Sequence, residues 1–160
     1  MSALFEWPHV VRADEADELG HANNEVYLHW MNKAAVAHSA ALGWHAEAYL
    51  QQGKGWVVRR HEVEYLRPAL PGTELIVRTW VQTFEKASSW RCYAILACPE
   101  HVLLARGRTL WAWIDYKTRR LCRVPAAVSS AFTLIPTNVF EAPAPALARP
   151  GHSQSTRPAH

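Results

Sequence analysis

Hydrophobic residues recur along this chain with two different periods, and the change of period divides it into elements. From Asn23 or Asn24 they recur every three or four residues, which is the spacing of one helix face, and Gly43 supplies a natural stop. The face consists of Tyr27, Trp30, Met31, Ala34, Ala35, His38 and Leu42. The pattern therefore predicts one helix of about twenty residues, roughly 30 Å long.

Segments rich in β-favouring residues lie on both sides of this helix. A first strand is expected at residues 4–12, and a short helix or turn at 46–52 follows the long helix. Further strands are expected at 56–67, 73–86, 90–98 and 102–116, with a short fifth piece that ends at Pro125. One long helix after the first strand, followed by an antiparallel meander, is an α+β layout.

The length of 160 residues fits one domain, which we place at residues 1–140. A domain of about 150 residues hides roughly 70% of the surface of its unfolded chain, so this one needs no disulfide or metal to fold. Residues 141–160 are rich in Pro, Ala and Ser, and we expect a flexible C-terminal tail there.

Charge and composition indicate which partners and which cellular compartment suit this protein. The net charge of +3 comes from scattered Arg without a long basic block, which does not indicate a nucleic-acid partner but suits anionic small molecules. None of the three Cys residues forms a C-x-x-C pair, so a reducing compartment is favoured over a disulfide framework. No signal-peptide pattern opens the chain, and no apolar run approaches the roughly 18 residues that span a bilayer. We therefore expect a cytoplasmic protein with no membrane partner.

The polar segment before the long helix is the strongest candidate for chemistry. It reads A-D-E-L-G-H-A-N-N-E-V-Y-L from Ala16 to Leu28, and it puts the carboxylate of Asp17 seven residues before Asn24, near the start of the helix. The first N–H groups of a helix have no partner within it and can stabilise an oxyanion. A carboxylate beside such a site suggests acyl transfer or hydrolysis.

The same segment resembles the acyl-CoA thioesterases of the hot-dog fold, the group that contains 4-hydroxybenzoyl-CoA thioesterase and the long-chain acyl-CoA thioesterases. Their usual pattern is an Asp, a few residues, Gly or Gln, His, Val, Asn, Asn, two variable residues and Tyr. The matching positions are Asp17, Gly20, His21, Asn23, Asn24 and Tyr27, whereas Ala22 stands where Val is commoner. The similarity of organisation extends from about Phe5 to about Pro136.

The resemblance implies a strongly curved antiparallel β-sheet wrapped around the long central helix. It also implies a homodimer or homotetramer in which sheets join edge to edge and each active site lies at a subunit boundary. The implied reaction is hydrolysis of an acyl-CoA to a free acid and coenzyme A, with no cofactor. Asp17 would act as nucleophile or as general base for a water, and the backbone N–H of Asn24 would hold the oxyanion.

Other residues are candidates for supporting roles. His21 is a supporting member of the catalytic site, and three basic residues suit a polyanionic coenzyme A. The candidate substrate contacts are Asn23, Tyr27, Lys86, Arg119 and Arg120.

Simpler roles stay open for most of these residues. Both Asn residues suit helix capping, Tyr27 suits the core, the basic residues suit a solvated surface, and Asp17 suits a turn. Three neighbouring acids compete with Asp17 for the catalytic role, although the simpler expectation places them in a solvated loop: Asp14, Glu15 and Glu18. Although the chain has nine His, no H-E-x-x-H or similar spacing occurs, so we expect no metal.

Alternatives to an acyl-CoA thioesterase also stay open. An acyl-ACP thioesterase would have the same fold with a different carrier, and a non-catalytic acyl-CoA-binding module would bind without turnover. A hydratase is disfavoured because the Asp-x-Asn-x-x-x-x-His arrangement is missing. The eight Trp residues hint at large apolar pockets or interfaces, although core packing is their usual role.

Overall fold

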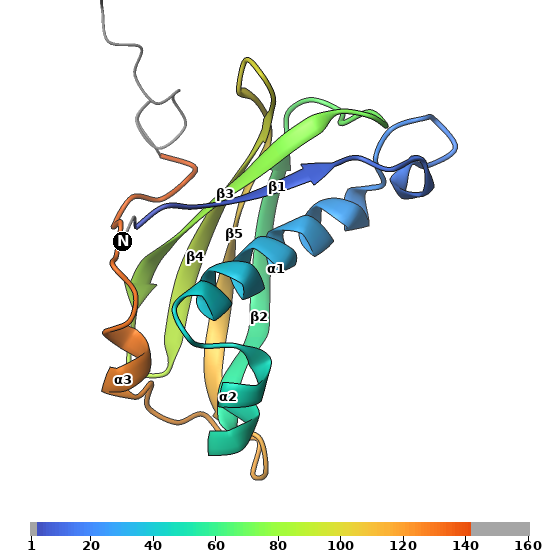
Figure 1. Cartoon of the computed structure of the whole chain (residues 1–160). Coiled ribbons are helices and arrows are strands. Elements are labelled where there is room, and N and C mark those ends of the chain that lie inside the picture. Colours follow the sequence, from blue (N-terminus) through green and yellow to red (C-terminus); the bar gives the residue numbers. More distant parts are fainter. Residues whose placement is uncertain (1–2, 142–160) are drawn as a thin grey trace, which may run out of the picture.

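The structure is a computed structural model that describes residues 3–141, so all of the expected tail except Glu141 lies outside the described residues. Its elements, in chain order, are β1 (Phe5–Val10), the 3-10 turn η1 (Ala13–Glu15), α1 (Asn24–Ala41), α2 (Ala46–Gln52), β2 (Lys54–Tyr65), β3 (Glu74–Phe84), β4 (Ser88–Ala97), β5 (Val102–Asp115) and α3 (Ala126–Ser129). Figure 1 shows α1 lying obliquely across one face of the sheet, with α2 and α3 at the lower end.

The strands form one antiparallel sheet in the order β1-β3-β4-β5-β2, so β1 and β2 are its edges. Bulges interrupt the pairing of β2 between Val58 and Arg60 and that of β3 between Val81 and Thr83. A bulge bends its strand and increases the local twist. The expected α+β layout, with one long helix against an antiparallel sheet, is confirmed.

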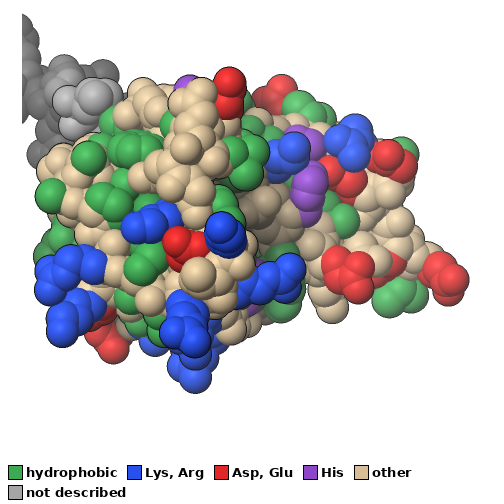
Figure 2. All heavy atoms as spheres, turned by 90° about the horizontal axis from the view of Figure 1, so that it is seen from below, with side chains coloured by type: hydrophobic (Ala, Val, Ile, Leu, Met, Phe, Trp, Pro, Cys, Tyr) green, Lys and Arg blue, Asp and Glu red, His purple; other side chains and the backbone are tan. Residues whose placement is uncertain are grey.

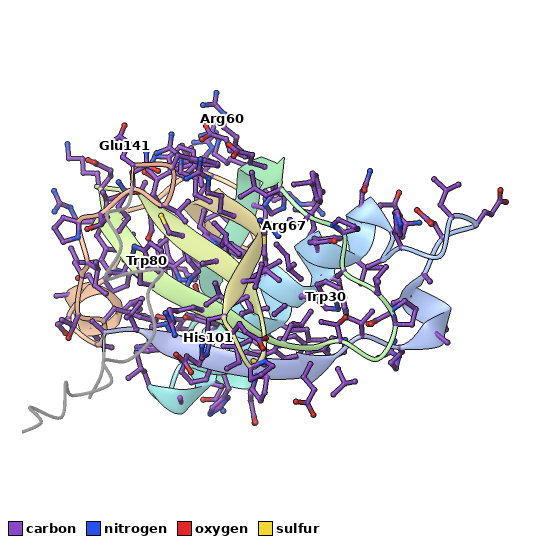
Figure 3. The ribbon with its side chains drawn as sticks, turned by 90° about the horizontal axis from the view of Figure 1, so that it is seen from above. Trp30, Arg60, Arg67, Trp80, His101 and Glu141 are labelled. Atoms are coloured by element: carbon purple, nitrogen blue, oxygen red, sulfur yellow. The ribbon has the colours of Figure 1, made fainter. Side chains whose placement is uncertain are left out.

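Helix α1 is held to the sheet by the apolar face that the sequence predicts. Asn23 caps its N-terminus, because its side-chain oxygen accepts the N–H of Glu25 at 3.1 Å. The buried residues of the helix are Tyr27, Trp30, Met31, Ala34, Ala35, His38 and Ser39, while Leu42 beyond it is half-buried. Figure 3 shows Trp30 within the body of the molecule and Arg60 at its surface, pointing outward.

Alternation along the central strands gives the sheet two buried faces. On one face Val77, Tyr93 and Ile95 pack with α1. On the other face Trp80, Cys92, Ala94 and Leu96 pack with Val139, so the chain after α3 returns across the sheet. The indole N–H of Trp80 donates to the carbonyl of Thr137 at 2.9 Å and fastens this return.

The expectation of a short fifth strand is wrong. Residues 121–124 form no strand: they meet β5 in an isolated bridge between Ile114 and Leu121, the N–H of Cys122 donates to the carbonyl of Trp113 at 3.1 Å, and the chain then forms the short helix α3. The reason is that β5 lies between β4 and β2, and β4 already pairs with it as far as Ala112. Only the last residues of β5 are left with a free side, which is too short for a strand.

No helix within residues 3–141 is both long enough and apolar enough to cross a membrane.

Candidate active site

Asp17 lies in the exposed loop between η1 and α1, where it closes a tight turn. Its Oδ1 accepts the N–H of Leu19 at 2.9 Å and that of His21 at 3.3 Å. Its own N–H donates to the carbonyl of His21 at 2.7 Å, and Gly20 has φ +77°, a conformation that glycine adopts without strain. The turn role considered for Asp17 is therefore present. Its Oδ2 accepts no hydrogen bond from the described residues, so half of the carboxylate is available for chemistry.

The start of α1 offers a free donor next to this loop. The N–H of Asn23 donates to the carbonyl of Glu15 at 2.9 Å, and the N–H of Val26 donates to the carbonyl of Asn23 at 2.9 Å. The N–H of Asn24, the first residue of α1, has no acceptor within residues 3–141. Such an N–H at the positive end of the helix dipole can hold a developing negative charge.

Glu15 is buried, so the expectation that it lies in a solvated loop is wrong; it is 5% exposed. Its carboxylate accepts hydrogen bonds from His9 Nε2 at 2.9 Å, the N–H of Arg12 at 2.9 Å and Trp30 Nε1 at 3.2 Å. Burial raises the pKa of Glu15, but the bonds from Arg12, His9 and Trp30 together outweigh it and leave the pKa below its ordinary value. This carboxylate ties the Asp17 loop to β1 and α1. The turn η1 directs the Glu15 side chain into the protein interior. No local pattern in the sequence predicts this burial.

The other acids and polar candidates near the loop have simpler surroundings. Asp14 is exposed and pairs with Arg12 at 2.9 Å, and Glu18 and His21 are exposed. Tyr27 is 3% exposed in the core, where its hydroxyl accepts the N–H of Ala69 at 2.9 Å. Burial raises the pKa of Tyr27, which suits a structural role better than that of an acid.

A pocket with a volume of about 320 Å³ lies at the other end of α1. It is bounded by the second half of α1, by α2 and by the sheet. Seven aromatic side chains contribute to its wall: Trp44, Tyr49, Trp56, Phe84, Trp111, Tyr116 and Phe132. Trp44, Trp56 and Trp111 thus line the pocket, whereas Trp30, Trp80 and Trp113 are fully buried in the core. Concave sites lined by aromatic groups are typical of small-molecule binding.

The wall of this pocket also contains Arg91, which sequence analysis missed. Arg91 is 6% exposed on the α1 face of β4. Its Nη1 donates to His38 Nδ1 at 2.9 Å and to Thr79 Oγ1 at 3.2 Å, and its guanidinium lies 5.6 Å from the centre of the Phe132 ring. Burial lowers the pKa of Arg91, yet a guanidinium stays charged at neutral pH.

No carboxylate within the described part of the chain pairs with Arg91, whereas other shielded arginines have one. Arg78, Arg106 and Arg108 bond to acids at 2.8, 3.1 and 2.6 Å, namely Glu6, Glu64 and Glu62. Burial, and then the charge of Arg91, lower the pKa of His38 to about 4, so His38 is a neutral acceptor at pH 7. An unpaired buried charge costs several kcal/mol. The only sequence signal was one Arg inside an apolar β-like run.

The three basic candidates lie at the pocket end of the molecule. Lys86 is in the turn between β3 and β4, and Arg119 and Arg120 follow β5; all are exposed. The N–H of Val124, shortly after them, donates to the carbonyl of Lys86 at 2.9 Å, which joins the two turns. Figure 2 views this end and shows Lys and Arg side chains gathered around it.

Within one chain, the pocket and the Asp17 loop lie apart, towards opposite ends of α1. Asn24 begins α1, and Asn32, the first helix residue in the pocket wall, comes eight residues later, which is about 12 Å along the helix axis. The structure therefore groups Asp17, His21, Asn23 and Asn24 at one end of α1 and Lys86, Arg119 and Arg120 at the other. No group of three or more His, Cys, Asp or Glu side chains that could hold a metal occurs in residues 3–141.

Comparison with known proteins shows the family to which this chain belongs. The model of the thioesterase-like superfamily matches residues 11–132. The chloroplastic acyl-[acyl-carrier-protein] hydrolase FATB3 of Cuphea viscosissima is 33% identical over 88 residues, which are 55% of this chain and 21% of that protein. The chain thus spans about a fifth of the length of this relative.

Solved structures share the fold at low sequence identity. A 1,4-dihydroxy-2-naphthoyl-CoA thioesterase from Synechocystis has a TM-score of 0.75 and 18% identity, over 80% of this chain and 94% of that one. An acyl-ACP thioesterase from Bacteroides thetaiotaomicron has a TM-score of 0.78 and 18% identity, over 89% of this chain and 59% of that one. The family match and these likenesses confirm the hot-dog fold that the sequence predicts.

Proposed function

We propose that this chain, which belongs to the thioesterase-like superfamily, is a thioester hydrolase that releases a free acid from an acyl-CoA. One observation carries the proposal: a carboxylate oxygen of Asp17 and the backbone N–H of Asn24 both lie near the start of α1. Neither group has a hydrogen-bond partner in residues 3–141. The N–H polarises the thioester carbonyl and holds its developing negative charge. Removal of such a donor typically costs on the order of a hundredfold in rate.

Asp17 opens the reaction in one of two ways. Its carboxylate attacks the carbonyl carbon to give a mixed anhydride, or it takes a proton from a water that attacks. In both cases the C–S bond breaks, the sulfur leaves as the thiol of the carrier, and water supplies the second oxygen of the acid. The exposed position of Asp17 leaves room for substrate or a partner subunit to cover it.

Coenzyme A is the carrier that we favour. Its phosphates suit the basic end of the molecule, where Lys86, Arg119 and Arg120 surround the turns next to the pocket. The second candidate is an acyl carrier protein, because the FATB3 relative and the Bacteroides structure are named for that carrier. The ratio of kcat/KM for a matched acyl-CoA and acyl-ACP decides between the two.

A homodimer brings the two ends of α1 together. The edge strand β2 is twelve residues long and has exposed Val58 and Tyr65, which suits it to pair with a second copy. A two-fold axis normal to the sheet joins two β2 strands antiparallel and also makes the two α1 helices antiparallel. The Asp17 end of one subunit then lies beside the pocket of its partner, so each active site is completed at the subunit boundary.

The experiment is thiol release from short, medium, long and aromatic acyl-CoAs by the wild type and by Asp17→Asn. Asparagine keeps an oxygen for the N–H groups of Leu19 and His21, so the turn is preserved while the reactive carboxylate is lost. We expect a loss of about 10²-fold or more in kcat. Asp14→Asn, in the neighbouring turn η1 and also exposed, is the matched control and should keep full activity.

The other outcomes separate the alternatives. A well-folded Asp17→Asn variant that hydrolyses like the wild type contradicts the role of Asp17. Turnover of acyl-ACP without turnover of any acyl-CoA assigns the other carrier. Tight binding of acyl-CoA without turnover of any thioester assigns a binding module.

A further inference from the structure

The pocket wall contains a buried cation that hydrolysis of a thioester does not require. Arg91 faces the α1 side of the sheet, and its Nη1 uses its two hydrogens on His38 Nδ1 and Thr79 Oγ1, at 2.9 and 3.2 Å. Both acceptors are neutral at pH 7, because a hydroxyl carries no charge and the His38 pKa is about 4. The guanidinium is therefore fixed in place by hydrogen bonds, but no negative charge neutralises it.

The remaining edge of the guanidinium is free. Arg91 Nε and Nη2 have no acceptor among residues 3–141, and these two nitrogens form the side-on fork that a carboxylate binds with two parallel hydrogen bonds. No acidic side chain in residues 3–141 pairs with Arg91. By contrast Arg78, which is 3% exposed, bonds to the carboxylate of Glu6 at 2.8 Å. The free edge of Arg91 can therefore receive a carboxylate from a molecule in the pocket.

The rest of the wall decides what kind of molecule carries this anion. Ser39 donates its hydroxyl to the carbonyl of Trp44, and Ser89 donates to the carbonyl of Thr83, each at 2.7 Å, so these polar groups are already satisfied. Aromatic rings line the space around Arg91. The volume of about 320 Å³ is about twice that of a cavity known to hold benzene, which leaves room for a ring with substituents.

We propose that this pocket selects acyl groups whose far end bears a carboxylate, which binds to the free edge of Arg91, so that the substrates are monothioesters of dicarboxylic acids. The inference rests on the proposed function, because it takes the pocket as the acyl site. The aromatic wall favours an aryl diacid over an aliphatic one of similar length.

Binding of small esters tests the pocket without any need for turnover. Monomethyl terephthalate keeps the distant carboxylate, whereas methyl 4-acetylbenzoate has nearly the same shape and no charge. Monomethyl adipate and methyl 6-oxoheptanoate form the matching aliphatic pair. Dissociation constants follow from quenching of the pocket Trp residues 44, 56 and 111 or from calorimetry. We expect the charged member of a pair to bind at least about tenfold tighter, since a hydrogen bond to a charged group is worth about one such factor or more.

Two variants test whether the preference for the charged ester depends on Arg91. Arg91→Met removes the charge but keeps the length of the side chain, so the charged and neutral esters should bind equally. Ser89→Ala, also in the wall, should keep the wild-type ratio. A larger ratio in the aryl pair assigns an aromatic diacid, and a larger ratio in the adipate pair assigns an aliphatic one.

The same comparison in turnover separates this inference from the proposed function. The CoA thioesters of terephthalic acid and 4-acetylbenzoic acid should differ at least about tenfold in kcat/KM for the wild type and not for Arg91→Met. A carboxylate preference in binding with no thioester hydrolysed supports the carboxylate site at Arg91 but removes the proposed function, and with it the assignment of monothioesters as substrates. Equal binding of both members in both pairs by the wild type overturns the inference, even if Arg91→Met does not fold. A preference that survives in folded Arg91→Met also overturns it.

Discussion

His38 gives the fold a pH dependence whose size follows from its surroundings. It is 4% exposed, stacked on Phe5 at 5.1 Å and edge-on to Phe132 at 5.4 Å, and its Nδ1 accepts a hydrogen bond from Arg91. Burial, and secondly the charge of Arg91, lower its pKa from 6.5 to about 4. Protonation would break the bond and put two cations in contact, so the folded protein resists it.

The sign and size of the effect follow from linkage. Above pH 6.5 His38 is neutral in both states and contributes nothing to the pH dependence. As the pH falls from 6.5 toward 4, the unfolded chain binds a proton at His38 and the folded chain does not, so the free energy of unfolding decreases. At about 1.4 kcal/mol for each pH unit, the full loss is about 3 kcal/mol.

The assay is urea unfolding followed by Trp fluorescence, at pH values from 7.5 down to 4.5. At the low end of this range buried carboxylates such as Glu15, whose pKa is lowered from 4.5, only begin to lose their contribution, and they do so equally in the two proteins that are compared. His38→Gln keeps an oxygen acceptor for Arg91 but cannot be protonated. We expect its stability to fall by about 2 kcal/mol less than that of the wild type over this range. His29→Gln, exposed on the same helix, is the matched control and should behave like the wild type.

An equal pH dependence in the wild type and in His38→Gln would refute this reasoning. It would mean that His38 takes up its proton in the folded protein at an ordinary pH, and that Arg91 is not held against a neutral ring.

Two more predictions concern the groups that hold the Asp17 loop and the start of α1. Glu15→Ala should lower the free energy of unfolding in urea by about 2–4 kcal/mol, because it leaves Trp30 Nε1 and His9 without their acceptor; an unchanged value would contradict the anchoring role. Tyr27→Phe should cost about 1–3 kcal/mol in thermal unfolding and speed amide exchange at Ala69, whose N–H then has no acceptor. Slow exchange at Ala69 in this variant would show that the bond does not form.

The elements of this fold were predictable wherever a local period carries them. The three-and-four spacing places the helix between Asn24 and Gly43, and α1 ends at Ala41, within two residues of the predicted stop. The helix or turn expected at about 46–52 is the helix α2 (Ala46–Gln52), which Gly53 ends at φ +70°. Alternation likewise gives the strands with errors of a few residues at their ends.

The site was less predictable, because its features depend on contacts between distant residues. Glu15 is buried through bonds to Trp30, fifteen positions away, and to His9 on another element. Arg91 is distinctive only because Thr79 and His38, from β3 and α1, supply neutral acceptors and no acid. The short strand expected after β5 failed for the same kind of reason, since the sheet order leaves only the last residues of β5 with a free side.

We expect each active site to combine the Asp17 loop of one subunit with the pocket of another. Thiol release by a mixture of two inactive variants tests it most directly. One variant is Asp17→Asn. The other is Ala46→Trp, which fills the pocket from an exposed wall position on α2, with Glu47→Trp on the same helix as its control.

Each of these two variants alone should be inactive, whereas Glu47→Trp should remain active. After the two inactive chains are refolded together in equal amounts, about half of the dimers contain one of each, and each mixed dimer has one intact site. The account predicts recovery of about a quarter of the wild-type activity. Mixed dimers that form and show no activity would contradict it, because the loop and the pocket would then have to serve the same chain.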